Sequence, residues 1–351
     1  MADTLEPRAA IRRMAPYSPP TAGRHGALRL DFNENTVGCS AHVLEFLRQH
    51  LSREALAVYP EYGEARRELA DFFGVSPDQL LLTNGTDEAI QLVVNTYVDS
   101  GDEVCILKPS YAMYRFYAEV AGAQVREIPY EEATLAFPLA ALLEAITPRT
   151  RAVLIANPNN PTGTGASVEQ VACLLERARH AAVLVDEAYY EFSGLTLLPH
   201  LAEHPNLFVS RTFSKAYGLA ALRMGCLISQ AANIAWVRKG QSPYSVNAVA
   251  VLAARAAVQD RQYVRRYVEE ALAARELLCS ELDRMGIPYY PSQANFVLVR
   301  AGHRALELRD RLREAGVLVR DRSYELPGCV RITVGTRQQV RRLVEELERI
   351  W

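Results

Sequence analysis

Between residues 60 and 230, short apolar runs alternate with segments of helical periodicity, and this alternation limits the folds open to the chain. The runs are nearly continuous, as in strands buried on both faces. Parallel strands need helical crossovers, which then cover the two faces of the sheet. The sequence therefore predicts an α/β fold with a mostly parallel sheet sandwiched by helices. The predicted strands cover residues 79–83, 103–107, 124–128, 152–156, 182–186, 207–211 and 224–229.

The two ends of the chain follow other patterns. Residues 1–40 are rich in Pro and Gly and predict an extended arm. A long helical stretch follows Ser245 as far as about Met285, and after it come short strands and two helices, near 303–315 and 336–350. A length of 351 residues fits roughly two domains. We expect an arm and part of a small domain at 1–44, a large domain at 45–244, and a small α+β domain at 245–351.

Composition excludes several classes of protein. A formal net charge of −2 argues against a nucleic-acid partner. The six cysteines are scattered and form no C-x-x-C pair, so we expect reduced thiols, no metal site and a reducing compartment. No window approaches 18 uninterrupted apolar residues, and the N-terminus has no apolar leader. We therefore expect a cytoplasmic protein that does not span a membrane.

Lysine is rare in this chain: only Lys108, Lys215 and Lys239 occur among 39 cationic Lys and Arg residues. Arg replaces Lys wherever a charge suffices, but only Lys can lose its proton and form a Schiff base with an aldehyde. Lys215 lies among small and hydroxylated residues, in the run SRTFSKAYGL at 210–219. It is therefore a candidate covalent anchor for pyridoxal phosphate.

Two strand-to-helix turns before Lys215 suit such a cofactor. In the turn at 83–88, Gly85 allows close approach of the backbone, and the free N–H groups of the next helix can hold phosphate. We expect Thr86 to be the N-cap of that helix and to contact the phosphate, because the carboxylate of Asp87 disfavours an anion. Tyr111 opens another predicted helix and could stack on a pyridine ring.

Three further features complete the candidate site. The NPNNPTG turn at 157–163 follows a buried strand and carries Asn160, whose amide can donate to a phenolate. Asp186 ends another buried strand, where a carboxylate needs a partner such as a protonated pyridinium. Hydroxyl and guanidinium groups near Lys215 suit a phosphate, namely Thr212, Ser214 and Arg223. Each feature alone also fits an ordinary turn, cap or ion pair; their joint occurrence in this order favours a cofactor site.

These blocks resemble the fold-type I pyridoxal-phosphate-dependent aminotransferases. The resemblance rests on NNPTG at 159–163, DEAY at 186–189, SKA at 214–216 and LRMG at 222–225, and it extends from Asn33 to Thr336. The arm and the RITVGT run at 331–336 are similar to the histidinol-phosphate branch of that family. The implied reaction transfers the amino group of L-histidinol phosphate to 2-oxoglutarate in histidine biosynthesis, giving imidazole-acetol phosphate and L-glutamate.

The resemblance also implies a role for each matching residue. Lys215 would form the Schiff base and move the proton, and Asp186 would pair with the pyridine nitrogen. Asn160 and Tyr189 would hold the ring phenolate, and Tyr111 would stack on the ring. The matching residues at the cofactor phosphate are Gly85, Thr86, Thr212, Ser214 and Arg223, and Asp87 is a further candidate cofactor-binding residue.

Other matching residues imply a partner and a substrate. Tyr59 matches a tyrosine that reaches the cofactor phosphate of the neighbouring subunit, which implies a homodimer with shared active sites. Tyr17, Arg320 and Arg331 match residues that contact the anionic end of the substrate. Asn33 lies in the arm that covers the site.

The arm departs from the family pattern, which reads Asn-Glu-Asn-Pro followed by Gly-Pro. Here the run is NENTVGC at 33–39, so two rigidifying prolines are missing and we expect a looser lid. This departure leaves an aromatic amino-acid aminotransferase open as an alternative. A decarboxylase of phosphorylated amino acids shares the same blocks. A cofactor-binding transcriptional regulator is a further alternative, although no basic helix-turn-helix segment is left over for it.

Overall fold

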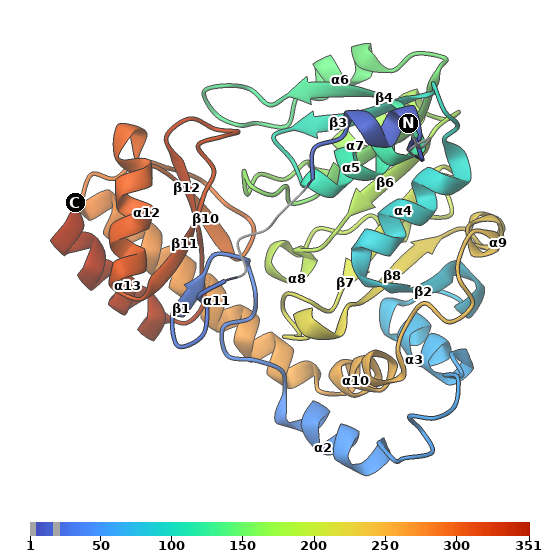
Figure 1. Cartoon of the computed structure of the whole chain (residues 1–351), viewed down its shortest axis with the longest axis horizontal. Coiled ribbons are helices and arrows are strands. Elements are labelled where there is room, and N and C mark those ends of the chain that lie inside the picture. The colour runs from blue at the N-terminus through green and yellow to red at the C-terminus, as the bar shows by residue number, and fades with distance from the viewer. Residues whose placement is uncertain (1–4, 17–21) are drawn as a thin grey trace.

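The computed structural model describes residues 5–16 and 22–351, which contain two separate β-sheets (Figure 1). The large sheet has seven strands in the order β2-β8-β7-β6-β5-β3-β4. Every pairing is parallel except those of β8, which runs antiparallel to both β2 and β7. The prediction of a mostly parallel sheet is confirmed. Its strands are β2 (Leu80–Asn84), β3 (Glu103–Lys108), β4 (Gln124–Pro129), β5 (Thr150–Ala156), β6 (Ala182–Asp186), β7 (Leu207–Thr212) and β8 (Met224–Ser229).

Helices cover both faces of the large sheet because successive strand residues point to opposite sides. In β6, Val183 and Val185 join one buried core, while Ala182 and Leu184 join the other. The first core includes residues of α3 (Gly63–Phe73), α6 (Leu139–Ala145), α7 (Val168–Arg177) and α10 (Ala248–Gln259). The second includes residues of α4 (Gly85–Tyr97), α5 (Ala112–Ala121) and α9 (Ala231–Lys239).

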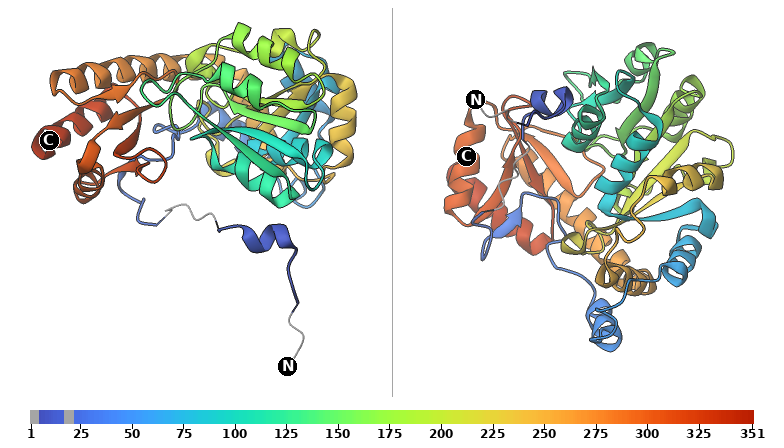
Figure 2. Two further views of the ribbon diagram at one scale, coloured as in Figure 1. Left: turned by 90° about the horizontal axis from the view of Figure 1, so that it is seen from above. Right: turned by 45° about the vertical axis from the view of Figure 1, so that its right-hand side comes forward.

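The small sheet has the order β1-β11-β12-β10-β9 and packs against three helices. Its first strand, from the arm, pairs in parallel with β11. The long helix α11 (Arg261–Arg284) extends from the large sheet to the small one (Figure 2). The other elements are β1 (Leu28–Leu30), β9 (Tyr289–Tyr290), β10 (Phe296–Arg300), β11 (Val317–Asp321), β12 (Cys329–Thr333), α12 (Ala305–Glu314) and α13 (Arg337–Ile350). The domain boundaries after residues 44 and 244 stay predictions.

Local details differ from the sequence-based expectations. The helical stretch after Ser245 is two helices, because Asp260 interrupts it and its carboxylate caps α11 by accepting the Tyr263 N–H at 3.1 Å. Helix α4 begins at Gly85 with Asn84 as its N-cap, so the assignment of Thr86 as N-cap was wrong. Gly85, the first residue of the helix, has a φ of +70°, which favours glycine, and the N-cap lies two residues earlier than expected. The arm is not wholly extended either, since Ala9–Arg13 form α1. Within the described residues, no helix is long and apolar enough to cross a membrane.

Candidate active site

The predicted cofactor residues meet at the carboxyl ends of β5, β6 and β7. The 157–163 turn leaves β5 there, Asp186 ends β6, and Thr212 ends β7 just before the Lys215 loop. Open α/β sheets bind ligands at this edge. Two adjoining cavities, of about 400 and 100 Å³, occupy it. Both are lined by Tyr111, Asn160, Tyr189, Ser214, Lys215 and Arg223.

Lys215 presents its amine at the wall of this cleft. Its Nζ donates to the backbone carbonyl of Phe32 in the arm at 3.0 Å. Burial lowers the pKa of Lys215 to about 8, and the nearby Arg331 guanidinium acts in the same direction. A neutral amine is therefore accessible near neutral pH, as nucleophilic attack on an aldehyde requires.

Asp186 is a buried carboxylate held by two hydroxyl groups. Its oxygens accept from Tyr114 Oη and Ser210 Oγ, each at 2.9 Å. Burial raises the pKa of Asp186 to about 6, although both hydrogen bonds oppose the rise. No described Lys, Arg or His lies within 4.0 Å of it. A cation supplied from the cleft would give this carboxylate the partner that it lacks.

A cradle of small and hydroxylated residues lies at the start of α4. A Cβ on Gly85 would lie 2.7 Å from Arg223 Nη2, and the φ of +70° at Gly85 is a backbone conformation that favours glycine. Thr86, Thr212 and Ser214 line the cavity beside it, and Arg223 Nη1 lies 3.4 Å from Ser214 Oγ. Converging N–H, hydroxyl and guanidinium donors of this kind can hold a phosphate.

Asp87 has a contact that the sequence did not reveal. Its carboxylate accepts from Tyr111 Oη at 2.8 Å and from Arg223 Nη2 at 3.2 Å. It therefore orients the predicted stacking ring and the predicted phosphate ligand at the same time. Asp87 also lines the smaller cavity, and its assignment as a cofactor-binding residue stays a prediction.

The arm lies over the opposite side of the cleft. Asn33 has a φ of +56°, and its Nδ2 donates to Tyr189 Oη at 2.9 Å. Asn160 Oδ1 accepts from Arg331, which leaves the amide NH₂ of Asn160 available to donate. Asn35 accepts from the backbone N–H groups of residues 37 and 38, and its Nδ2 donates to the Ala216 carbonyl at 3.0 Å. The contacts of Asn35 flank Thr36, one of the two positions that lack a proline; the looser lid stays a prediction.

Three arginines gather at the end of the cleft formed by the small sheet. Arg320 and Arg331 are direct partners across β11 and β12, and Arg322 lies beside them in the cavity lining. Like charges directly opposite each other destabilise a sheet. Burial and the neighbouring guanidinium groups lower the pKa of Arg331 to about 10. The Nε atoms of Arg322 and Arg331 are buried without a hydrogen-bond partner among the described residues. Arg322 is ion-paired with Glu325, so an anion in the cleft would chiefly relieve the repulsion between Arg320 and Arg331.

One predicted residue, Tyr59, is not brought into this cleft. Tyr59 is 73% exposed and stacks on Tyr244 with 4.2 Å between ring centroids, outside both cavities of its own chain. Tyr17 lies outside the described residues.

Sequence reasoning missed several residues of the cleft. Tyr114 could have been suspected, because it follows Tyr111 by three residues on the same helical face. Ser210 becomes the neighbour of Asp186 only through the β6–β7 register. Phe32, Glu34, Arg322 and Tyr324 also line the cavity, and nothing local in the sequence distinguished them.

The cleft fits pyridoxal phosphate by its chemistry. A buried amine of lowered pKa, a buried carboxylate without a cation, and a glycine-lined phosphate cradle match the aldehyde, the pyridinium and the phosphate of that cofactor. The fold and the site together define a pyridoxal-phosphate-dependent enzyme. Residues 26–347 match the family model described as aminotransferase class I and II. The chain belongs to this family.

Individual relatives and structures agree with this assignment. The histidinol-phosphate aminotransferase of Geobacillus sp. (strain WCH70) is 36% identical, over 98% of this chain and 97% of the relative. That of Symbiobacterium thermophilum is 37% identical over 97% of each chain. The crystal structure of histidinol-phosphate aminotransferase from Sinorhizobium meliloti, in complex with pyridoxal-5'-phosphate, matches with a TM-score of 0.90 at 26% identity, covering 99% of this chain and 98% of that one.

Proposed function

We propose that this aminotransferase transfers the amino group of L-histidinol phosphate to 2-oxoglutarate, giving imidazole-acetol phosphate and L-glutamate in histidine biosynthesis. The observation that carries the proposal is the cluster of Arg320, Arg322 and Arg331 facing Lys215. Guanidinium forks fit both a phosphate and a carboxylate, so one cluster can accept the phosphorylated donor and the dicarboxylate acceptor in turn. The names of the curated relatives support the same reaction.

We assign the residues of the chain as follows. When bound, pyridoxal phosphate supplies an aldehyde that accepts the amino group and a ring that delocalises the electrons left by the departing proton. Lys215 holds the cofactor and then takes the proton from the carbon that bears the amino group. Asp186 keeps the pyridine nitrogen protonated, with Tyr114 and Ser210 fixing its carboxylate. Asn160 and Tyr189 donate to the ring oxygen.

The test is a spectrophotometric titration of the purified holoenzyme with L-histidinol phosphate and, separately, with L-phenylalanine, without keto acid. We expect the visible cofactor band to be lost at low histidinol phosphate and only at high phenylalanine, because phenylalanine has no phosphate for the arginine cluster. The reverse preference would move the function to aromatic amino acids. Release of carbon dioxide would instead indicate a decarboxylase.

We also infer that the enzyme works in the cytoplasm as a homodimer whose subunits share their active sites. The exposed pair of Tyr59 and Tyr244 supports the homodimer, together with exposed Leu44, Leu56 and Val58 nearby in the chain. Large aromatic and aliphatic side chains are uncommon at a free surface and are enriched in interfaces. In the dimer, the Tyr59 hydroxyl would contact the cofactor phosphate of the partner subunit.

Tyr59→Phe should weaken retention of the cofactor about tenfold, since it removes one hydrogen bond to a charged group. Equilibrium dialysis of the cofactor measures the loss. Mixed dimers of Tyr59→Phe and Lys215→Ala chains should regain one native site, made of Lys215 from one chain and Tyr59 from the other. Both pairs are measured as purified heterodimers, and the matched control pairs wild type with the double variant, so that its one site with Lys215 would face Phe. Tighter cofactor binding in the control heterodimer than in the first heterodimer would argue against shared sites.

A further inference from the structure

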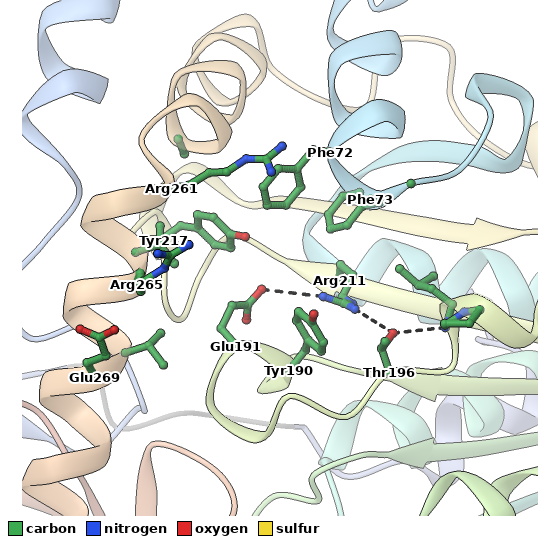
Figure 3. A pocket seen from close by; sticks show the side chains of 16 residues that line it. Phe72, Phe73, Tyr190, Glu191, Thr196, Arg211, Tyr217, Arg261, Arg265 and Glu269 are labelled. Carbon is green, nitrogen blue, oxygen red and sulfur yellow. Dashed lines mark hydrogen bonds and ion pairs between the residues drawn. The ribbon is translucent and has the colours of Figure 1, made fainter.

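A second cavity, of about 720 Å³, lies behind the large sheet on the face opposite the cofactor cleft (Figure 3). Its walls are the end of α3, the start of α11, and the segment from Tyr190 to Pro199 that follows β6. Its volume is within the range of small-molecule sites. None of the residues assigned to the cofactor or the substrate lines it.

Strand alternation separates this cavity from the cofactor cleft. On β7, Thr212 lines the cleft, while its neighbour Arg211 lines the second cavity. After β6, Tyr189 faces the cleft and Tyr190 faces the second cavity. Adjacent residues of a strand point to opposite faces, which separates Arg211 from Thr212. Tyr190 begins the short helix α8 (Tyr190–Ser193), and no described side chain lines both the cleft and the second cavity.

Aromatic rings dominate the interior of the second cavity. Phe72 and Phe73 project from the end of α3 and stay partly exposed, opposite Tyr217 (Figure 3). Arg211 forms part of the floor, with its guanidinium carbon 3.5 Å from the Tyr190 ring centroid. Rings placed in this way suit a flat aromatic ligand, which can stack or meet them edge to face.

The buried charges of the floor are already paired. Arg211 lies 2.8 Å from the Glu187 carboxylate and 3.9 Å from that of Glu191, and its Nη2 also donates to Thr196 Oγ1 at 2.9 Å. Arg211 is thus neutralised from within the fold. The floor therefore offers a polarisable aromatic surface and, among its described residues, no free cation, because Arg211 is shared by Glu187 and Glu191. Glu191 also lines the cavity, and burial raises its pKa to about 7.

The rim carries the available cations. Arg261 and Arg265 lie one turn apart on α11, both are exposed, and both side chains lie along the cavity in Figure 3. Neither has a carboxylate within 4.0 Å in the part of the chain that the structure describes, although Glu269 lines the same wall one turn further on. The guanidinium carbon of Arg261 lies 4.9 Å from the Phe72 ring centroid, beside the place that a ligand ring would take.

We propose that this cavity is a second binding site, for a small aromatic carboxylic acid. The ring would lie among Phe72, Phe73 and Tyr190, and the carboxylate would reach Arg261 and Arg265. The apolar walls select the ring and the two rim guanidinium groups select the acid, so neither an uncharged aromatic nor a simple inorganic anion satisfies both parts.

The test is calorimetric titration of the holoenzyme with phenylacetate. All proteins carry Arg331→Gln. This substitution removes the acid anchor of the cofactor cleft, so that the remaining binding can be assigned to the second cavity. We expect one phenylacetate per chain, with phenylacetamide binding about tenfold more weakly because it lacks the charge. Adding Arg261→Gln and Arg265→Gln to the same protein should weaken the binding of phenylacetate by a similar factor. Leu198→Trp should abolish binding by filling the cavity.

Arg313→Gln is the matched control, since Arg313 is exposed on α12 far from the cavity lining and should leave the affinity unchanged. The visible cofactor band and the melting temperature verify that each variant is folded; if Leu198→Trp fails to fold, the paired arginine variant decides. The proposal is overturned if phenylacetate gives no heat at millimolar concentration. It is equally overturned if the cavity variants bind like their parent, or if phenylacetamide binds as well as phenylacetate.

Discussion

Lys215→Ala should reduce transamination by on the order of 10⁴-fold or more, because it removes both the covalent anchor and the base that moves the proton. The amine of Lys215 is buried in the cleft and its pKa is lowered to about 8, so this residue is prepared for both roles. The measurement is the rate at which L-histidinol phosphate bleaches the visible band. It is combined with the mass of the chain after borohydride treatment, which should increase by the reduced cofactor only when Lys215 is present.

Because the chain has only three lysines, few control variants are needed. Lys239→Ala changes an exposed lysine on α9 that lies over the Trp236 ring, and we expect no loss of rate. Lys215→Arg keeps a positive charge but cannot form a Schiff base, so it should be as inactive as the alanine variant. A Lys215→Ala protein that still carries a borohydride-fixed cofactor and turns over would place the anchor elsewhere.

Asp186→Asn should have the second largest effect, a loss of on the order of 10²- to 10³-fold in the same half-reaction. Asparagine keeps the size of the side chain, and Tyr114 and Ser210 could still hydrogen-bond to it. It lacks the negative charge that would hold a proton on the pyridine nitrogen. The loss should therefore appear in the rate of proton removal and much less in the affinity for the donor, which separate single-turnover measurements distinguish.

The matched control is Asp71→Asn, which removes an exposed carboxylate on α3 and should keep the wild-type rate. Asp186→Glu retains the charge, so partial activity in that variant would indicate that charge rather than shape matters most. An Asp186→Asn enzyme within about tenfold of wild type would show that the carboxylate does not supply the electrostatic support assigned to it.

The sequence by itself determined the class of the fold and predicted most of the residues that meet in the cleft. Apolar runs separated by helical segments predict a covered parallel sheet, because burial on both faces leaves this pattern in the residues of each strand. Turn residues such as Gly85 and the 157–163 motif mark strand ends, and Lys215 is conspicuous by its chemistry. These signals are local, since each depends on residues close together in the chain.

Only the tertiary structure decided which residues hold those groups in place. Ser210 lies beside Asp186, and Arg320 lies opposite Arg331, because of strand registers between segments that are distant in sequence. Asp87 joins Tyr111 to Arg223 across two helices and a loop. The aromatic cavity behind β7 likewise needs α3 and α11 together. Register and helix docking are fixed by long-range packing of the whole core, which no local pattern encodes.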